Sequence, residues 1–163
     1  MTTIRPVTPA DAEAITAIYA HHVLHGTGTF DIDPPGVDEW RAKIADIQAR
    51  DWPFFVAAGV GGLLGYAYAA QFRDRAAYRT ASEDSIYIAE RARGTGVGSA
   101  LLGALIAAAP AAGFREMVAV IGGPEPASVA LHSKLGFREV GRLYDVGIKF
   151  GRSLDVLFMQ RRV

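Results

Sequence analysis

The spacing of hydrophobic positions changes several times along the chain, and each change predicts a new element. Residues 2–7 predict a short first strand. Thr8 is expected to open a helix, because Pro9 then takes the first helical position and Asp11 follows three residues after the cap. This helix should end at Gly26. Its buried stripe is expected to contain the side chains that repeat at helical spacing: Ile15, Ile18, Tyr19, His22 and Val23.

A second amphipathic helix is predicted over residues 37–50, after which the pattern switches to strands. The later elements are expected in this order: strands at 54–58 and 63–70 that form a hairpin, a strand at 85–90, a helix at 99–109, a strand at 115–121, a helix at 126–135, and strands near 137–147 and 153–162. The resulting order, β-α-α-β-β-β-α-β-α-β-β, predicts an α/β domain with a central mixed sheet.

The composition narrows the class of protein. The chain has 163 residues, which fits one domain, and half of them are hydrophobic, which excludes a disordered chain. It has no cysteine, which excludes a disulfide scaffold, a thiolate metal site and a cysteine nucleophile. Seventeen basic and 17 acidic residues give no net charge, which argues against a nucleic-acid partner. Without a long apolar run or a leader peptide, we expect a cytoplasmic protein with no membrane partner.

A glycine-rich turn between a predicted strand and a predicted helix carries the most chemical information. It comprises Arg93, Gly94, Thr95, Gly96, Val97, Gly98 and Ser99. Glycines let the backbone approach a ligand closely, and the free N–H groups of a helix's first turn attract an anion such as a pyrophosphate. The turn is not a P-loop, because no Lys-Ser or Lys-Thr follows, and its G-x-G-x-G spacing differs from the dinucleotide fingerprint. An ordinary structural turn is the alternative.

The motif Arg93-x-x-Gly96-x-Gly98 resembles the Arg/Gln-x-x-Gly-x-Gly/Ala signature of the Gcn5-related N-acetyltransferases (GNAT), where the turn binds the pyrophosphate of acetyl-CoA. The segments VAVIGG and PASVALHSK and a Leu-Gly-Phe at 135–137 follow in that family's order. The resemblance implies one GNAT domain over residues 1–163, with a mostly antiparallel sheet of about seven strands flanked by helices. It also implies acetyl-CoA as co-substrate and no metal.

A narrower resemblance covers nearly the whole chain. The segments FRDRAAYR, SEDSIYI and VGIKFGRSLDVLFMQRRV are similar to those of the phosphinothricin and methionine sulfone/sulfoximine N-acetyltransferases. That subfamily implies acetylation of the α-amine of a small amino acid, herbicide resistance as a consequence, and a homodimer. Two alternatives stay open: acetylation of another small amine or a protein N-terminus, and a catalytically degenerate acyl-CoA-binding domain.

Acetyl transfer to an amine requires a base, because a free α-amine is mostly protonated at neutral pH. Glu83 is the candidate, since the resembled enzymes carry a catalytic glutamate at this position. Strand alternation places Glu83, Ser85 and Tyr87 on one face and Asp84 on the other. From its position alone, Glu83 is equally well a solvated carboxylate at the start of a strand. No cysteine can carry the acetyl group, so direct transfer is expected.

The resemblance also implies which residues would contact the cofactor. The backbone of Ile86–Ile88 would align the thioester, with the N–H of Ile88 polarising its carbonyl. His132 stands where the broad family has a proton-donating tyrosine and the subfamily a histidine, and a structural core histidine is the alternative. Glu125 replaces an asparagine that usually contacts the cofactor, and Lys134 is expected to face a cofactor phosphate or to lie on the surface. The three histidines at the end of the first helix are expected to be structural.

The loop before the Glu83 strand is the expected acceptor site. Arginine forks hold carboxylates and phosphinates, and the resembled enzymes use this loop for the acidic groups of the acceptor. An arginine-rich loop taken alone is a charged surface loop. Ser153 replaces a tryptophan common in relatives, which puts the exact amino acid in question. The expected substrate-binding residues are Phe30, Arg73, Asp74, Arg75, Tyr78, Glu83, Asp84 and Ser85.

Overall fold

The computed structural model describes residues 1–163 and contains the predicted elements in the predicted order. The helices and strands are β1 (Thr3–Pro6), α1 (Ala12–His25), α2 (Val37–Ala49), β2 (Phe54–Gly59), β3 (Gly62–Gln71), β4 (Ala81–Ile88), α3 (Val97–Ala108), β5 (Glu116–Gly122), α4 (Pro126–Lys134), β6 (Arg138–Lys149) and β7 (Arg152–Arg162). Short 3₁₀ turns, which the hydrophobic pattern did not predict, lie between several of these elements.

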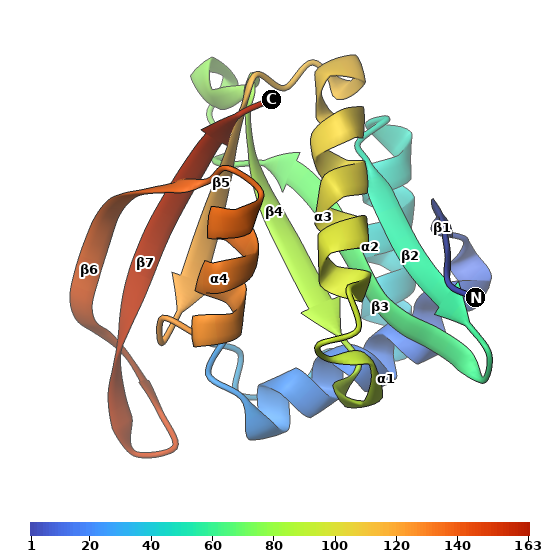
Figure 1. The fold of residues 1–163 in the computed structure, drawn as a ribbon, viewed down its shortest axis with the longest axis horizontal. Helices are drawn as coiled ribbons and strands as arrows, with labels where there is room; N and C mark the ends of the chain where they lie inside the picture. Colours follow the sequence, from blue (N-terminus) through green and yellow to red (C-terminus); the bar gives the residue numbers. More distant parts are fainter.

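The strands form one seven-stranded sheet in the order β1-β2-β3-β4-β5-β7-β6. Every neighbouring pair is antiparallel except β4 and β5, which run parallel. That parallel pairing covers only Ala81–Asp84 against Glu116–Ala119. Beyond these residues the two strands diverge, as Figure 1 shows. The mixed, mostly antiparallel sheet expected from the family resemblance is confirmed. The gap that opens between β4 and β5 beyond Asp84 and Ala119 is called the splay.

Helices cover both faces of the sheet, and each face has its own hydrophobic cluster. On one face lie α3 and α4, and Leu101 and Leu105 of α3 pack with Met117 of β5. On the other face α1 and α2 cover the sheet, with Ile15 and Trp40 in the same cluster as the aromatic residues of β3. Because side chains alternate along a strand, β2 and β3 contribute buried residues to both clusters and are held on both sides.

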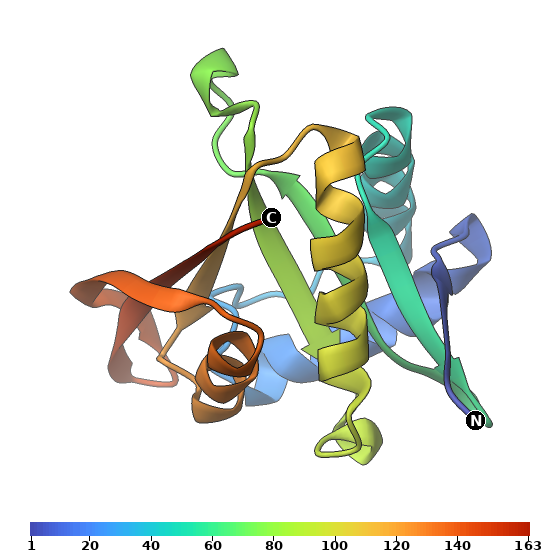
Figure 2. The same cartoon turned by 45° about the horizontal axis from the view of Figure 1, so that its top comes forward.

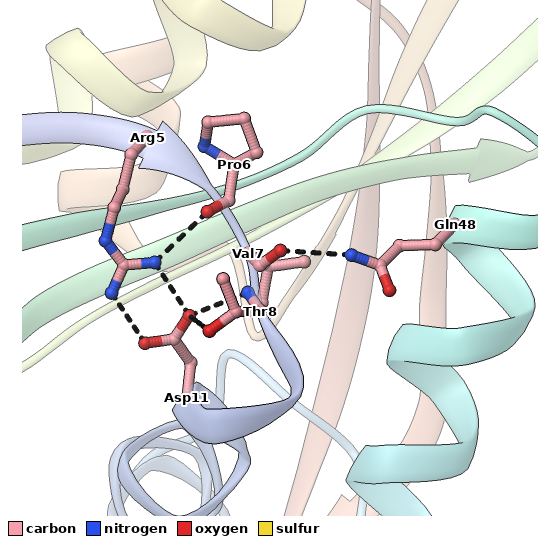
Figure 3. A network of polar contacts seen from close by, with 6 residues as sticks. All are labelled: Arg5, Pro6, Val7, Thr8, Asp11 and Gln48. Carbon is pink, nitrogen blue, oxygen red and sulfur yellow. Dashed lines mark hydrogen bonds and ion pairs between the residues drawn. The ribbon is translucent and has the colours of Figure 1, made fainter.

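The start of α1 is held by a network around the buried carboxylate of Asp11 (Figure 3). Asp11 accepts hydrogen bonds from the backbone N–H and hydroxyl of Thr8 and a bidentate pair from Arg5, at 2.7 and 2.8 Å. The Arg5 guanidinium lowers the pKa of Asp11 despite its burial. Gln48 of α2 donates to the Val7 carbonyl at 3.0 Å. The predicted cap at Thr8 is confirmed, with a 3₁₀ turn, Pro9–Asp11, preceding the α-helix.

The largest difference from the sequence-based elements lies at β4. The strand was expected to begin at Ser85, whereas it begins at Ala81. Its polar first half, Ser82–Ser85, carries no apolar alternation to mark a strand. Pairing with β3 on one side and β5 on the other supplies the hydrogen bonds that define it. Glu83 therefore lies within a central strand and not ahead of it.

Candidate active site

A cavity of about 430 Å³ occupies the splay between β4 and β5, and we call it the splay cavity. Its walls come from β4, β5, α4, the loop after α1 and the turn between β6 and β7. The lining residues are His22, His25, Gly26, Thr27, Gly28, Glu83, Asp84, Ser85, Ile86, Tyr87, Arg93, Ala119, Val120, Ile121, Glu125, Ser128, His132, Phe150 and Arg152. The expected acceptor residues among them are Glu83, Asp84 and Ser85, and the expected cofactor residues are Ile86, Tyr87, Arg93 and Glu125.

A second cavity of about 490 Å³, the turn cavity, lies over the glycine-rich turn. Both cavities are lined by His22, Ile86, Arg93, Glu125 and Ser128, so they adjoin each other. The predicted cofactor residues that line the turn cavity are Ile86, Ile88, Arg93, Gly94, Gly96, Gly98, Ser99, Glu125 and Lys134. Thr95 and Val97 do not line it, because the Thr95 hydroxyl donates to Ala92 and Val97 is buried in the core.

The glycines of the turn adopt a conformation that other residues avoid. Gly94 has φ +73°, and Gly96, the N-cap of α3, has φ +88°. A Cβ added at either glycine would meet no protein atom within 4 Å. The left-handed backbone and the open space beside it fit a close backbone approach to a ligand at the helix N-terminus.

Glu83 extends into the splay cavity from the β4 face that is covered by α1 and α2. Its side chain is 33% exposed and lies 3.5 Å from the guanidinium of Arg73. Burial raises the pKa of Glu83, while the nearby positive charge of Arg73 opposes that rise. A raised pKa brings the titration of a carboxyl group closer to neutral pH, where it can accept a proton from an ammonium group.

Substituting Arg73 by methionine is expected to raise the pKa of Glu83 further, because the opposing positive charge is lost. If Glu83 acts as a base, the acidic limb of the kcat/KM pH profile should then move to higher pH. Arg79→Met is the matched control, since Arg79 lies in the same loop and its guanidinium reaches only the carbonyl of Ala76. An unmoved acidic limb in Arg73→Met would contradict the coupling.

Asp84 points to the opposite face, as predicted, and meets His132 of α4. The distance from His132 Nε2 to Asp84 Oδ2 is 2.9 Å, and both side chains are only 2% exposed. The other ring nitrogen, Nδ1, lies 2.7 Å from the carbonyl oxygen of Ser128. Asp84 thus lines the splay cavity with its carboxylate engaged by His132, an arrangement that the sequence did not predict.

Glu125, which replaces an asparagine that usually contacts the cofactor in the resembled family, lies at the boundary of the two cavities. It is the N-cap of α4, and its carboxylate accepts a hydrogen bond from the Ser128 N–H at 3.0 Å. A carboxylate is a favourable cap because it neutralises the positive end of the helix dipole. The departure from asparagine therefore has a structural use in this chain.

His22 is the site residue that the sequence analysis missed. It was expected to be structural, yet it lines both cavities. Its Nε2–H donates to the carbonyl of Ile88 at 2.8 Å, at the end of β4, and burial lowers the pKa of the imidazole. His25 also lines the splay cavity. The loop that follows α1 passes close to the sheet at Thr27, where a Cβ at Gly122 would lie 2.9 Å from the Thr27 carbonyl oxygen. The local pattern around His22 does not reveal this contact.

Several expected acceptor residues lie outside both cavities. Four of them belong to the segment between β3 and β4, which projects from the body of the protein in Figure 2: Arg73, Asp74, Arg75 and Tyr78. Phe30 is also absent from the cavity walls. Its ring packs against the backbone of Gly122 and Gly147, so it links β5 to β6. Among the arginines of this loop, Arg73 is the one that forms an ion pair with Glu83 of the same chain.

A model of the acetyltransferase (GNAT) domain family matches residues 4–158. The chain belongs to the GNAT acetyltransferase family. It is an acetyl-CoA-dependent N-acetyltransferase, and the family and enzyme class predicted from the glycine turn are confirmed.

Relatives of this GNAT protein include characterised enzymes. It is 48% identical over 160 residues to the phosphinothricin N-acetyltransferase of Alcaligenes faecalis, covering 98% of this chain and 81% of that protein. It is 38% identical over 158 residues to the L-methionine sulfoximine/L-methionine sulfone acetyltransferase of Pseudomonas aeruginosa, covering 96% and 92%. The crystal structure of a phosphinothricin acetyltransferase from Sinorhizobium meliloti in complex with acetyl-CoA superposes with a TM-score of 0.96 at 45% identity, covering 99% and 88%.

Two further observations concern metals and membranes. No group of three or more histidine, aspartate or glutamate side chains is arranged to hold a metal ion in this GNAT structure. None of its helices has both the length and the hydropathy needed to span a bilayer.

Proposed function

We propose that this GNAT enzyme transfers the acetyl group of acetyl-CoA to the α-amine of a small amino acid of the phosphinothricin or methionine sulfone/sulfoximine type. The observation that carries the proposal is the junction of the two cavities. Glu83 opens onto a space that adjoins the glycine turn, so a base and an anion-binding turn serve one continuous site. The names of the relatives supply the substrate class.

In the proposed reaction the pyrophosphate of acetyl-CoA binds the backbone N–H groups of the turn, with Arg93 and Lys134 beside it. The backbone of Ile86–Ile88 aligns the thioester, and the N–H of Ile88 polarises its carbonyl. Glu83 removes a proton from the ammonium group of the acceptor. The amine nitrogen then attacks the carbonyl carbon, the carbon–sulfur bond breaks, and coenzyme A leaves as a thiolate. The nitrogen loses its second proton as the amide forms, and this proton balances the one that the thiolate takes up.

The acidic groups of the acceptor are proposed to bind the loop before β4. Arg73 is placed for this, because its guanidinium lies 3.5 Å from the carboxylate of Glu83. Arg75 and Tyr78 would act at the outer end of the same loop. The protein is further proposed to work in the cytoplasm as one GNAT domain, and there it would confer resistance to the herbicide phosphinothricin.

The direct test is thiol release from acetyl-CoA with a panel of amines. Release with phosphinothricin or methionine sulfoximine is the expected result. Release only with other amines or N-terminal peptides would replace the proposed acceptor while keeping the proposed base. Acetyl-CoA binding without turnover on the whole panel would contradict the catalytic proposal and favour a degenerate acyl-CoA-binding domain.

We also propose a homodimer that forms through β6. This edge strand is exposed over most of its length. Its exposed hydrophobic side chains, with the residue that follows the strand, are Val140, Leu143, Tyr144, Val146, Ile148 and Phe150. A monomeric protein rarely leaves an apolar edge strand unprotected, so a second copy is the proposed cover. Ser153, also exposed, ties β7 to the irregular part of β6 between Leu143 and Gly147 by donating to Asp145 at 2.8 Å.

Ile148→Asp is expected to convert the dimer to a monomer, because Ile148 is 76% exposed on β6 and a charge there would be buried in the interface. Light scattering coupled to gel filtration measures the change in mass. Val60→Asp is the matched control, since Val60 is 92% exposed in the turn between β2 and β3 and should leave the dimer intact. A monomeric wild-type protein at micromolar concentration would refute the dimer.

A further inference from the structure

Asp84 and His132 have the geometry of a buried, hydrogen-bonded ion pair, and we call this pair the clamp. Both ring nitrogens of His132 face oxygen acceptors, Asp84 Oδ2 at 2.9 Å and the Ser128 carbonyl at 2.7 Å. A neutral imidazole has a hydrogen on only one nitrogen and can donate only one of these bonds. The doubly protonated imidazolium donates both, so the surroundings select the charged form.

The electrostatic balance agrees with this assignment. Burial alone would lower the pKa of His132, but hydrogen bonding to Asp84, its negative charge and the Ser128 carbonyl raise it above its ordinary value. Asp84 Oδ1 is buried without a protein partner, which leaves His132 as the stabilising cation for this carboxylate. The Phe137 ring packs edge-on against the imidazole, with ring centroids 4.9 Å apart. The other charged or titratable groups around the splay cavity are Glu83, Tyr87, Arg93, Glu125, His22, His25 and Arg152.

The clamp joins α4 to β4 at the point where β4 and β5 begin to diverge. Asp84 is the last residue of β4 that pairs with β5 before the strands diverge. His132 is the only fully buried residue of α4. The same helix supplies Ser128, Leu131 and Lys134 to the wall of the turn cavity. The position of that wall relative to β4 therefore depends on this polar contact.

We propose that Asp84 and His132 are positioning residues that dock α4 at the vertex of the splay and thereby shape the binding site for coenzyme A. In this role His132 is not the proton donor to the departing thiolate, because both N–H groups are already donated within the protein. The inference rests on the proposed placement of the cofactor in the turn cavity. The charge pairing itself is independent of that placement.

The test combines a titration with a binding measurement. The side-chain ¹⁵N signals of His132 should show an imidazolium at pH 7.5 in the ligand-free wild type, where a histidine of ordinary pKa near ~6.5 is mostly neutral. In Asp84→Asn the imidazole should be neutral at that pH. The dissociation constant of coenzyme A, measured by calorimetry, should rise about tenfold in Asp84→Asn, because a displaced wall misaligns the ligand.

Asp46→Asn is the matched control, since Asp46 is an exposed acid paired with Arg50 on α2 and should change neither readout. A neutral His132 at pH 7.5 in the wild type would overturn the clamp even if Asp84→Asn failed to fold. An unchanged coenzyme A affinity in folded Asp84→Asn would also overturn the positioning role. A His132→Gln enzyme with unchanged coenzyme A affinity and a strongly reduced kcat would restore the proton-donor role. Failure of the wild type to bind coenzyme A would instead refute the proposed function and leave the titration result standing.

Discussion

Replacing Glu83 by glutamine is expected to lower kcat by a factor of about 10²–10⁴, the range for loss of a general base. The substitution keeps the size of the side chain and removes its capacity to accept the proton of an ammonium group. Glu83 lies on the acceptor side of the splay cavity and does not line the turn cavity, so the affinity for coenzyme A should change little. Steady-state kinetics and calorimetry on the same preparation separate the two effects.

The matched control for this experiment is Glu13→Gln, because Glu13 is an exposed glutamate on α1 whose side chain is 81% exposed. It should retain wild-type kinetics. The pH profile provides a second check. Since burial raises the pKa of Glu83, the acidic limb of kcat/KM in the wild type should lie above the usual range for a carboxylate and should vanish in Glu83→Gln. A Glu83→Gln enzyme with full activity would remove Glu83 from the mechanism.

Gly96→Ala is expected to weaken coenzyme A binding by at least about tenfold and to destabilise the fold by about 1–2 kcal/mol. Gly96 has φ +88° at the N-cap of α3, a conformation in which a Cβ is strained. The added methyl group would also occupy open space beside the N–H groups that are proposed to bind the pyrophosphate. Calorimetric titration and chemical denaturation measure the two losses independently.

The same helix provides a control with the same substitution. Gly103 lies within α3, has ordinary helical geometry and has open space around its Cβ direction. Gly103→Ala should therefore stabilise the protein by about 0.5–1 kcal/mol and leave coenzyme A binding unchanged. Equal effects of the two substitutions on affinity would show that the left-handed turn is not the cofactor contact.

The order of elements could be predicted from the sequence because it depends on local information. The period of the apolar positions identified α1, α2 and the β2–β3 hairpin, and the cap residues Thr8 and Asp11 marked a helix start correctly. The glycine turn was also local, and its residues line one cavity, apart from Thr95 and Val97. The family resemblance then assigned chemistry that spacing alone had left open.

The remaining features depend on contacts between distant parts of the chain. Asp84 and His132 are 48 residues apart, and neither position reveals that they meet. His22 reaches the end of β4 across 66 residues. The beginning of β4 was missed because its strand geometry comes from pairing on both sides and not from its own polar sequence. Such pairings are a property of the folded sheet, and propensity does not encode them.

The ring of Phe30 packs against the backbone of β5 at Gly122 and of β6 at Gly147. A Cβ at Gly122 would lie 2.7 Å from this ring, and one at Gly147 would overlap it. The three positions are thus mutually constrained during evolution. A methyl group at Gly147 would require the aromatic ring to move or to be lost, whereas one at Gly122 would also meet the backbone carbonyl oxygen of Thr27 at 2.9 Å. Loss of the ring would therefore open position 147 to substitution and leave position 122 closed.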